Sequence, residues 1–168
     1  MNDTNKMIGT FNTLMVSNNY PVSCPVAPDT MTDLIRNSAP AEWDEVKRGV
    51  YADVQRLVIN RPDYADMFNI MDGLEYNGLT LYSMTQTENG EPVWSNIYIQ
   101  NIEVRDNEIY VDPNLADKVV IGEDGMSVFV YALKDDHFQI RDKASTDYVI
   151  EEHGTFGDLL SALIVTVK

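Results

Sequence analysis

The 168-residue sequence is poor in the side chains that most metal sites and many catalytic sites need. It contains one cysteine, Cys24, and two histidines, His137 and His153, which lie sixteen residues apart. A single cysteine excludes an internal disulfide and is typical of a reducing compartment. Two separated histidines without a nearby cysteine lack the clustered spacing of a zinc site. The sequence therefore predicts no metal site and no cofactor.

Basic side chains are also scarce. Lys and Arg number 12 against 27 Asp and Glu, which gives a formal net charge of -15. Residues 103–152 alone carry 13 acidic and 5 basic side chains. Nucleic acids and anionic lipids both need a basic face, so the composition predicts neither as a partner. The excess of acidic side chains has two interpretations. It forms either a solvated surface that keeps the protein soluble or an electrostatic field that steers a basic protein partner.

Long apolar runs are missing as well. No stretch approaches the 18 consecutive apolar residues of a membrane-spanning helix. Residues 1–6 contain no basic region that precedes a long apolar core, so we expect no secretion signal. Together with the single cysteine, these absences predict a cytoplasmic protein.

Motifs of known chemistry are not found. No Gly-rich phosphate loop appears, and the turn from Gly122 to Gly125 is acidic and would repel phosphate. Ser83 does not stand in a nucleophile elbow, and no acidic cluster matches a calcium loop. Carboxylates are plentiful, so a small hydrolase with an acid pair stays the least favoured of three functional classes. We expect no catalytic residues and no enzymatic activity.

The apolar residues that are present follow helical and strand periods. Spacing of three and four residues predicts helices, and alternation predicts strands. For 94–105 the helix has a strand as its alternative. The predicted helices are 7–16, 30–37, 42–59, about 95–105 and the segment after Thr155, and the predicted strands are 79–84, 108–111, 119–121, 126–133, around Phe138 and Ile140, and 148–150.

Residues 66–83 form the clearest corner of the chain, predicted as a helix end, a tight turn and a strand start. Gly73 falls where a left-handed helix cap needs a residue without Cβ, and Asn77-Gly78 is a turn dipeptide. We interpret Asp72, Gly73, Asn77 and Gly78 as structural, with positive φ at Gly73 or Gly78. Five large side chains are expected in one buried core: Trp43, Phe68, Tyr82, Phe129 and Leu160.

The acids between residues 88 and 136 fall mostly at predicted turns. Turns at one end of an antiparallel sheet lie close together, so these acids could form one surface for a basic partner. Successive hairpin turns alternate ends, so the sequence leaves their convergence open. The candidate partner-binding residues are Glu88, Glu91, Glu123, Asp124, Asp135 and Asp136.

Three blocks of sequence form a recognisable order. The first holds Asp72-Gly73-Leu74, Asn77-Gly78 and Leu81-Tyr82-Ser83. The second is 120–124 followed by 128–131, and the third is 137–142 followed by 155–160. In this order the blocks resemble the SUKH superfamily, closest to its YrhA-like branch. The resemblance covers about residues 43–164, whereas the first forty residues match little. It implies one α+β domain over residues 1–168, with a central, mostly antiparallel sheet flanked by helices.

The resemblance also implies a function. Many bacterial SUKH proteins act as immunity proteins that bind and neutralise toxins, which are often nucleases. The expected partner is then a cognate toxin with a basic surface, because a nuclease site must attract phosphate. The alternative is a regulatory or scaffolding protein-interaction module on the same fold. The motifs of the resemblance are structural and assign no catalytic residue.

Overall fold

A computed structural model describes residues 3–168; Met1 and Asn2, the first residues of the predicted domain and of its N-terminus, lie outside the described part. Its centre is a six-stranded sheet in the order β1-β2-β5-β6-β7-β8, in which all neighbouring strands run antiparallel. A short hairpin of β3 and β4 stands apart from it. The strands are β1 (Leu74–Tyr76), β2 (Leu79–Leu81), β3 (Thr87–Glu88), β4 (Glu91–Pro92), β5 (Val119–Glu123), β6 (Ser127–Ala132), β7 (His137–Asp142) and β8 (Val149–His153).

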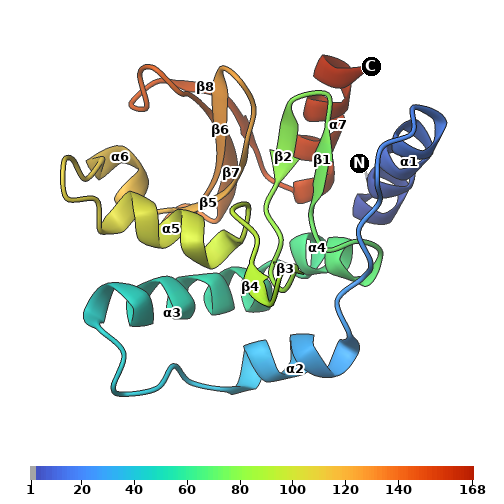
Figure 1. Cartoon of the computed structure of the whole chain (residues 1–168). Coiled ribbons are helices and arrows are strands. Elements are labelled where there is room, and N and C mark those ends of the chain that lie inside the picture. Colours follow the sequence, from blue (N-terminus) through green and yellow to red (C-terminus); the bar gives the residue numbers. More distant parts are fainter. Residues whose placement is uncertain (1–2) are drawn as a thin grey trace.

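Helices flank the central sheet on several sides. Figure 1 shows α1 beside α7 on one side, and α3, α5 and α6 on the other. This arrangement confirms the α+β class and the antiparallel sheet flanked by helices that the sequence predicts. The helices are α1 (Thr4–Ser17), α2 (Pro28–Arg36), α3 (Glu45–Asn60), α4 (Pro62–Ala65), the 3-10 helix η1 (Asp66–Asn69), α5 (Ile97–Arg105), α6 (Pro113–Ala116) and α7 (Phe156–Val167).

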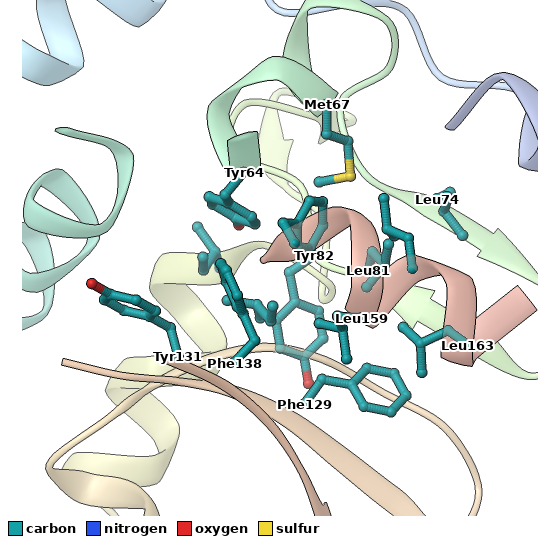
Figure 2. Close-up of a cluster of buried hydrophobic side chains, with 14 of the residues drawn as sticks. Tyr64, Met67, Leu74, Leu81, Tyr82, Phe129, Tyr131, Phe138, Leu159 and Leu163 are labelled. Carbon is teal, nitrogen blue, oxygen red and sulfur yellow. The ribbon is translucent and has the colours of Figure 1, made fainter. Parts of the chain in front are cut away.

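The buried apolar side chains form one cluster between the sheet and the helices (Figure 2). Tyr64 of α4 lies at its aromatic centre, with ring centroids 5.3 Å from Phe68, 6.3 Å from Phe138 and 5.0 Å from Phe156. Edge-on and tilted contacts of this kind add to the gain from burial. Four of the five expected core residues, Phe68, Tyr82, Phe129 and Leu160, are confirmed as buried.

Trp43 is the exception, and its prediction as a core residue was wrong. The sequence placed it inside a helix from 42 to 59, but α3 begins at Glu45. Asp44 is the N-cap, and its carboxylate accepts a hydrogen bond from the Lys47 N–H at 2.8 Å. A cap residue leaves the helical path, so Trp43 lies outside the helix and stays partly exposed.

The strand predicted at 108–111 was also wrong, because this segment is irregular and exposed. The Asn107 side-chain oxygen accepts hydrogen bonds from the N–H groups of Ile109 at 2.9 Å and Tyr110 at 3.1 Å. An Asn side chain that binds the backbone just ahead offers it an alternative to a strand ladder. The helix predicted at about 95–105 is confirmed as α5, which begins at Ile97 and has Asn96 as its N-cap.

The corner at 72–78 has the backbone that the sequence predicts. Gly73 and Gly78 hold φ of 77° and 83°, and Asn77 holds 48°, so the β1–β2 turn has two consecutive positive φ angles. At Gly73 the chain also approaches itself closely. A Cβ there would lie 2.7 Å from the Leu81 oxygen and 2.9 Å from the Ser83 nitrogen, whereas Gly78 has open space.

We expect the two glycines to respond differently to alanine. Gly78→Ala carries only the backbone strain of a positive φ and should lower the free energy of unfolding by about 1 kcal/mol. Gly73→Ala carries the same strain plus a clash with two main-chain atoms, and should lose at least about 1 kcal/mol more. Urea unfolding of both variants measures the difference. Equal losses would contradict the clash at Gly73, and two neutral substitutions would contradict a structural role for the corner.

Candidate functional site

The turn between β5 and β6 holds two of the predicted partner-binding acids. Asp124 shapes this turn, because its carboxylate accepts the N–H groups of Met126 at 2.8 Å and Ser127 at 2.6 Å. Glu123, at the end of β5, lies 3.2 Å from the Lys143 ammonium. Met126, at the tip, is 80% exposed. The turn therefore holds two acidic side chains in fixed positions and exposes an apolar side chain at its tip.

The β7–β8 loop lies at the same end of the sheet as the β5–β6 turn, because only the β6–β7 turn, at the opposite end, comes between them. Lys143 joins the two segments. Its N–H donates to the Met126 oxygen at 2.9 Å, and its ammonium donates to the Asp124 main-chain oxygen at 2.8 Å. Tyr148, at the far end of the loop, is 61% exposed. Two turns from different hairpins thus form one surface.

A third segment, residues 106–112, reaches the same surface from α5. Thr146 of the β7–β8 loop donates its hydroxyl to Asp112 at 2.6 Å, and Asn114 donates to that hydroxyl at 3.2 Å. Just before this contact, Ile109 is 96% exposed and Tyr110 is 65% exposed. We call the assembly of 106–112, 123–126 and 143–148 the loop-end surface.

A hollow of about 200 Å³ opens beside the loop-end surface, between α5, α6 and the sheet. Tyr82, Asp112, Glu123, Lys143 and Thr146 are among the residues that line it. Burial, together with the neighbouring Glu123 carboxylate, raises the pKa of Tyr82, so this hydroxyl stays protonated at neutral pH. The hollow offers a neutral hydroxyl and already paired charges.

An amide side chain of α5 bonds directly to the sheet. Within β5, only Gly122 and Glu123 pair with β2, so the next stretch of β5 lacks a strand on that side. Asn101 of α5 takes this place: its oxygen accepts the Val120 N–H at 2.8 Å and its nitrogen donates to the Val120 oxygen at 2.8 Å. This pairing sets the position of α5 and of segment 106–112 behind it.

The other predicted acids do not join the loop-end surface. Asp135 and Asp136 occupy the β6–β7 turn, at the opposite end of β6 from Glu123 and Asp124. Glu88 and Glu91 face each other across the separate β3–β4 hairpin. The structure therefore distributes the six acids over three places, because successive turns of a meander alternate ends.

Asp136 has a structural environment that its sequence does not reveal. The Tyr131 hydroxyl donates to it at 2.6 Å, and the Arg61 guanidinium lies 3.6 Å away. Arg61 also donates to both oxygens of Asp63, at 3.0 and 2.8 Å, and to the Gly154 oxygen at 2.8 Å. This network ties the start of α4 to the β6–β7 turn and to the start of α7.

The corner residues form a site of structural contacts. The Asp72 carboxylate is 2% exposed and accepts hydrogen bonds from the Met84 N–H at 2.7 Å, the Thr85 N–H at 3.0 Å and the Thr85 hydroxyl at 2.6 Å. A hollow of about 250 Å³ beside it is lined by Ser23, Ser83 and Gln86 among others. No lysine or histidine lines this hollow. Asp72 therefore serves as an anchor for the chain.

The histidines and the cysteine lie apart from one another. His137 lies 3.5 Å from Glu152 and His153 lies 3.9 Å from Glu151, both along β7 and β8, while Cys24 is exposed near α2. Within residues 3–168, no group of three or more His, Cys, Asp or Glu could hold a metal ion. In the same described residues, no helix is long and apolar enough to cross a membrane.

The comparisons with known proteins identify one relative. No family model matches the chain, and no solved structure matches it. An Escherichia coli (strain K12) protein named as the uncharacterized protein YrhA is 30% identical over 132 residues, which cover 79% of this chain and 91% of YrhA. This chain belongs to the YrhA family. The name of YrhA assigns no activity, so this relationship identifies a family and no function.

The sequence did not lead us to predict Ile109, Tyr110 and Tyr148 as exposed surface residues. For the first two, the neighbouring residues do indicate exposure. They follow Asp106-Asn107-Glu108 and precede Asp112-Pro113, a setting rich in turn formers that favours exposed chain over a strand. Tyr148 carried no such signal, because it directly precedes the alternating residues of β8.

The Arg61–Asp63 pair yields a prediction of pH dependence. Partial burial raises the pKa of Asp63, but hydrogen bonds from Arg61 and from the Phe156 N–H outweigh burial, so the net pKa lies below its usual value. The stability from Asp63 is therefore present above the unfolded pKa of about 3.9 and is lost as pH falls through the folded pKa. At pH 7, Asp63→Asn should lower the free energy of unfolding by about 1–3 kcal/mol relative to the wild type. Below pH ~4 this difference between the two proteins should be smaller, because the wild type loses the same contribution.

Asp135→Asn provides the control, since it removes the same charge from an exposed side chain nearby. Its free energy of unfolding should stay within about 0.5 kcal/mol of the wild type. Urea unfolding at a series of pH values measures all three proteins. If Asp63→Asn matched Asp135→Asn at pH 7, the network around Arg61 would not be structural.

Proposed function

We propose that this chain is a non-enzymatic, immunity-type binding protein that neutralises a basic toxin domain, with a nuclease as the best-fitting class. The loop-end surface is the proposed contact region and the cytoplasm the proposed place of action. The observation that carries the proposal is that three segments held together by hydrogen bonds expose large apolar side chains and carry mostly acidic charges. The resemblance to the SUKH superfamily agrees with this function.

The apolar part of the surface suits an anchor for a protein partner. Ile109, Tyr110, Met126 and Tyr148 come from three segments that hydrogen bonds hold together. Single exposed apolar residues are ordinary, whereas several gathered within a polar rim mark a protein contact. Tyrosine is among the side chains that dominate binding energy in such contacts.

The charge around these anchors determines the kind of partner. The three segments carry Asp106, Glu108, Asp112, Glu123, Asp124 and Asp147, against one basic residue, Lys143. Acidic groups at the rim of a contact speed association with a basic protein and reject an acidic one. A nuclease presents a basic cleft because its substrate carries phosphates. An acidic protein that covers such a cleft inhibits by exclusion of the substrate and needs no chemistry of its own.

Genomic context separates the proposed function from a regulatory or scaffolding module. An immunity protein is expected beside a gene for a polymorphic toxin, since each toxin-producing cell must neutralise its own toxin. A neighbouring gene for a basic toxin domain would support the proposal and would supply the partner for the assays below. Neighbours without any toxin domain would favour the regulatory or scaffolding alternative.

The apolar anchors give the direct test. Ile109→Asp with Tyr110→Asp places two charges where the proposal has buried contacts, so the dissociation constant for the neighbouring toxin domain should rise at least about 30-fold, as for a hot-spot loss of 2 kcal/mol. Isothermal titration calorimetry measures it. Because both side chains are exposed, the free energy of unfolding should change little.

Val165→Asp is the matched control. Val165 is a 72% exposed apolar residue on α7, away from the loop-end surface. Its variant should bind the toxin domain as the wild type does and should still abolish toxin activity. A loss of binding in the control with normal binding of the double variant would place the contact elsewhere and overturn the proposal.

A further inference from the structure

A small aromatic hollow lies between α3 and α5. Its volume is about 120 Å³, and its lining consists of Trp43, Lys47, Tyr51, Tyr98 and Ile102. The Tyr51 and Tyr98 rings stack with centroids 5.7 Å apart and planes 23° apart, and Trp43 meets Tyr51 edge-on at 5.6 Å. We call this hollow the aromatic cup.

Two lining residues of the cup, Tyr98 and Ile102, pack against the hydrophobic core, whereas Trp43 and Tyr51 lie outside it. Trp43, Tyr51 and Tyr98 are each partly exposed, unlike the fully buried rings around Tyr64. Trp43 lies before the N-cap of α3 and reaches the cup from outside the helix. Its side chain therefore adds an open aromatic face to the surface, where a residue needed only for packing would be covered.

A cation already occupies this aromatic face. The Lys47 ammonium lies 4.0 Å from the centroid of the Trp43 ring, well within the distance of a favourable cation–π contact. Lys47 is exposed and makes no ion pair with any residue of the described chain. Three acidic residues, Glu42, Asp44 and Glu45, lie within five positions of Lys47 in the sequence.

We propose that the aromatic cup binds one lysine or arginine side chain of a basic protein partner, which displaces Lys47. The aromatic lining supplies the negative ring faces that attract a cation, and the adjacent acids favour the same charge. The volume fits one side-chain end and is far below the ~300 Å³ or more of most small-molecule sites. Lys47 acts as a displaceable internal occupant that keeps the cup closed to neutral groups.

The cup lies close enough to the loop-end surface to serve the same partner. Tyr98 and Ile102 belong to α5, and the segment 106–112 follows directly from its last residue. Nine helical residues rise about 13 Å, a span that one side of an ordinary protein contact covers easily. Figure 1 shows the start of α3, the end of α5 and α6 on the same side of the molecule. The identity of the partner rests on the proposed function, whereas the binding of a cation does not.

Trp43 itself provides the test, because the chain has two tryptophans and the other, Trp94, is 55% exposed and can be replaced. In the Trp94→Phe protein, Trp43 fluorescence is titrated with the capped peptide Gly-Arg-Gly and with its neutral analogue Gly-norleucine-Gly, at constant ionic strength. The arginine peptide should give a saturable change and the norleucine peptide none. Equal responses to both would overturn the proposal.

Lys47→Met separates displacement from simple attraction by the acidic surface. It removes the competing ammonium and keeps a similar apolar stem, so the arginine peptide should bind about two- to fivefold more tightly, as expected when a contact of ~0.5–1 kcal/mol is removed. A control, Lys134→Met, removes an equal charge from the exposed β6–β7 turn and should leave binding unchanged. An affinity that stayed the same in Lys47→Met would contradict the role of Lys47.

The peptide assay uses no toxin domain, so its outcome is independent of the proposed function. If the arginine peptide binds and no toxin is neutralised, the cup stands and the toxin partner falls. If the norleucine peptide binds equally well while the toxin is neutralised, the cup falls and the loop-end surface stands.

Discussion

The buried carboxylate of Asp72 is the contact on which the rest of the structure depends. The carboxylate oxygens accept three hydrogen bonds from Met84 and Thr85. The main-chain N–H of Asp72 donates to the Cys24 oxygen at 3.0 Å, and its main-chain oxygen accepts from the Gln86 side chain at 2.9 Å. Hydrogen bonds to a charged group are each worth about 1.5–3 kcal/mol, and a buried carboxylate without them would be very unfavourable. The side chain and the main chain of this one residue together join the corner to residues 84–86 and to Cys24.

Because Asp72 fixes this corner, β2 leaves the sheet at a defined point. The Ser83 N–H then donates to Ser95, and the Ser83 oxygen accepts from Ile97 at the start of α5. Asn101 of α5 takes over the edge of β5 that β2 vacates. The position of α5 in turn sets both the aromatic cup and segment 106–112. The corner that carries the family resemblance thus supports the proposed binding surfaces from a distance, as scaffolds commonly do for loops.

The sequence predicted elements wherever local rules and burial agree. Three predictions needed no knowledge of distant residues and were confirmed: the periodic helix that is α3, the helix after Thr155 and the turn at Asn77-Gly78. The prediction for Trp43 failed because Asp44 is the N-cap, so the helix begins after Trp43. The prediction of a strand at 108–111 failed because alternation specifies a strand only where a neighbouring strand exists, and here the Asn107 side chain bonds the backbone of the segment instead.

The candidate site was less predictable, since it depends on which turns share an end of the sheet. Glu123 and Asp124 were identified, but their separation from Asp135 and Asp136 follows from strand order, which the sequence does not state. The apolar anchors and the aromatic cup arise from contacts between helices and loops far apart in the chain. Fold alone does not assign function, so the binding role rests on these surfaces.

Hydrogen–deuterium exchange of the whole chain, alone and with the neighbouring toxin domain, tests the central claim most directly. The account predicts slower exchange on binding at 106–112, 123–126 and 143–148, and unchanged exchange at the corner from 72 to 86. New protection at 72–86 without any change in the loop-end surface would contradict it, and would make the corner the binding site instead of the scaffold.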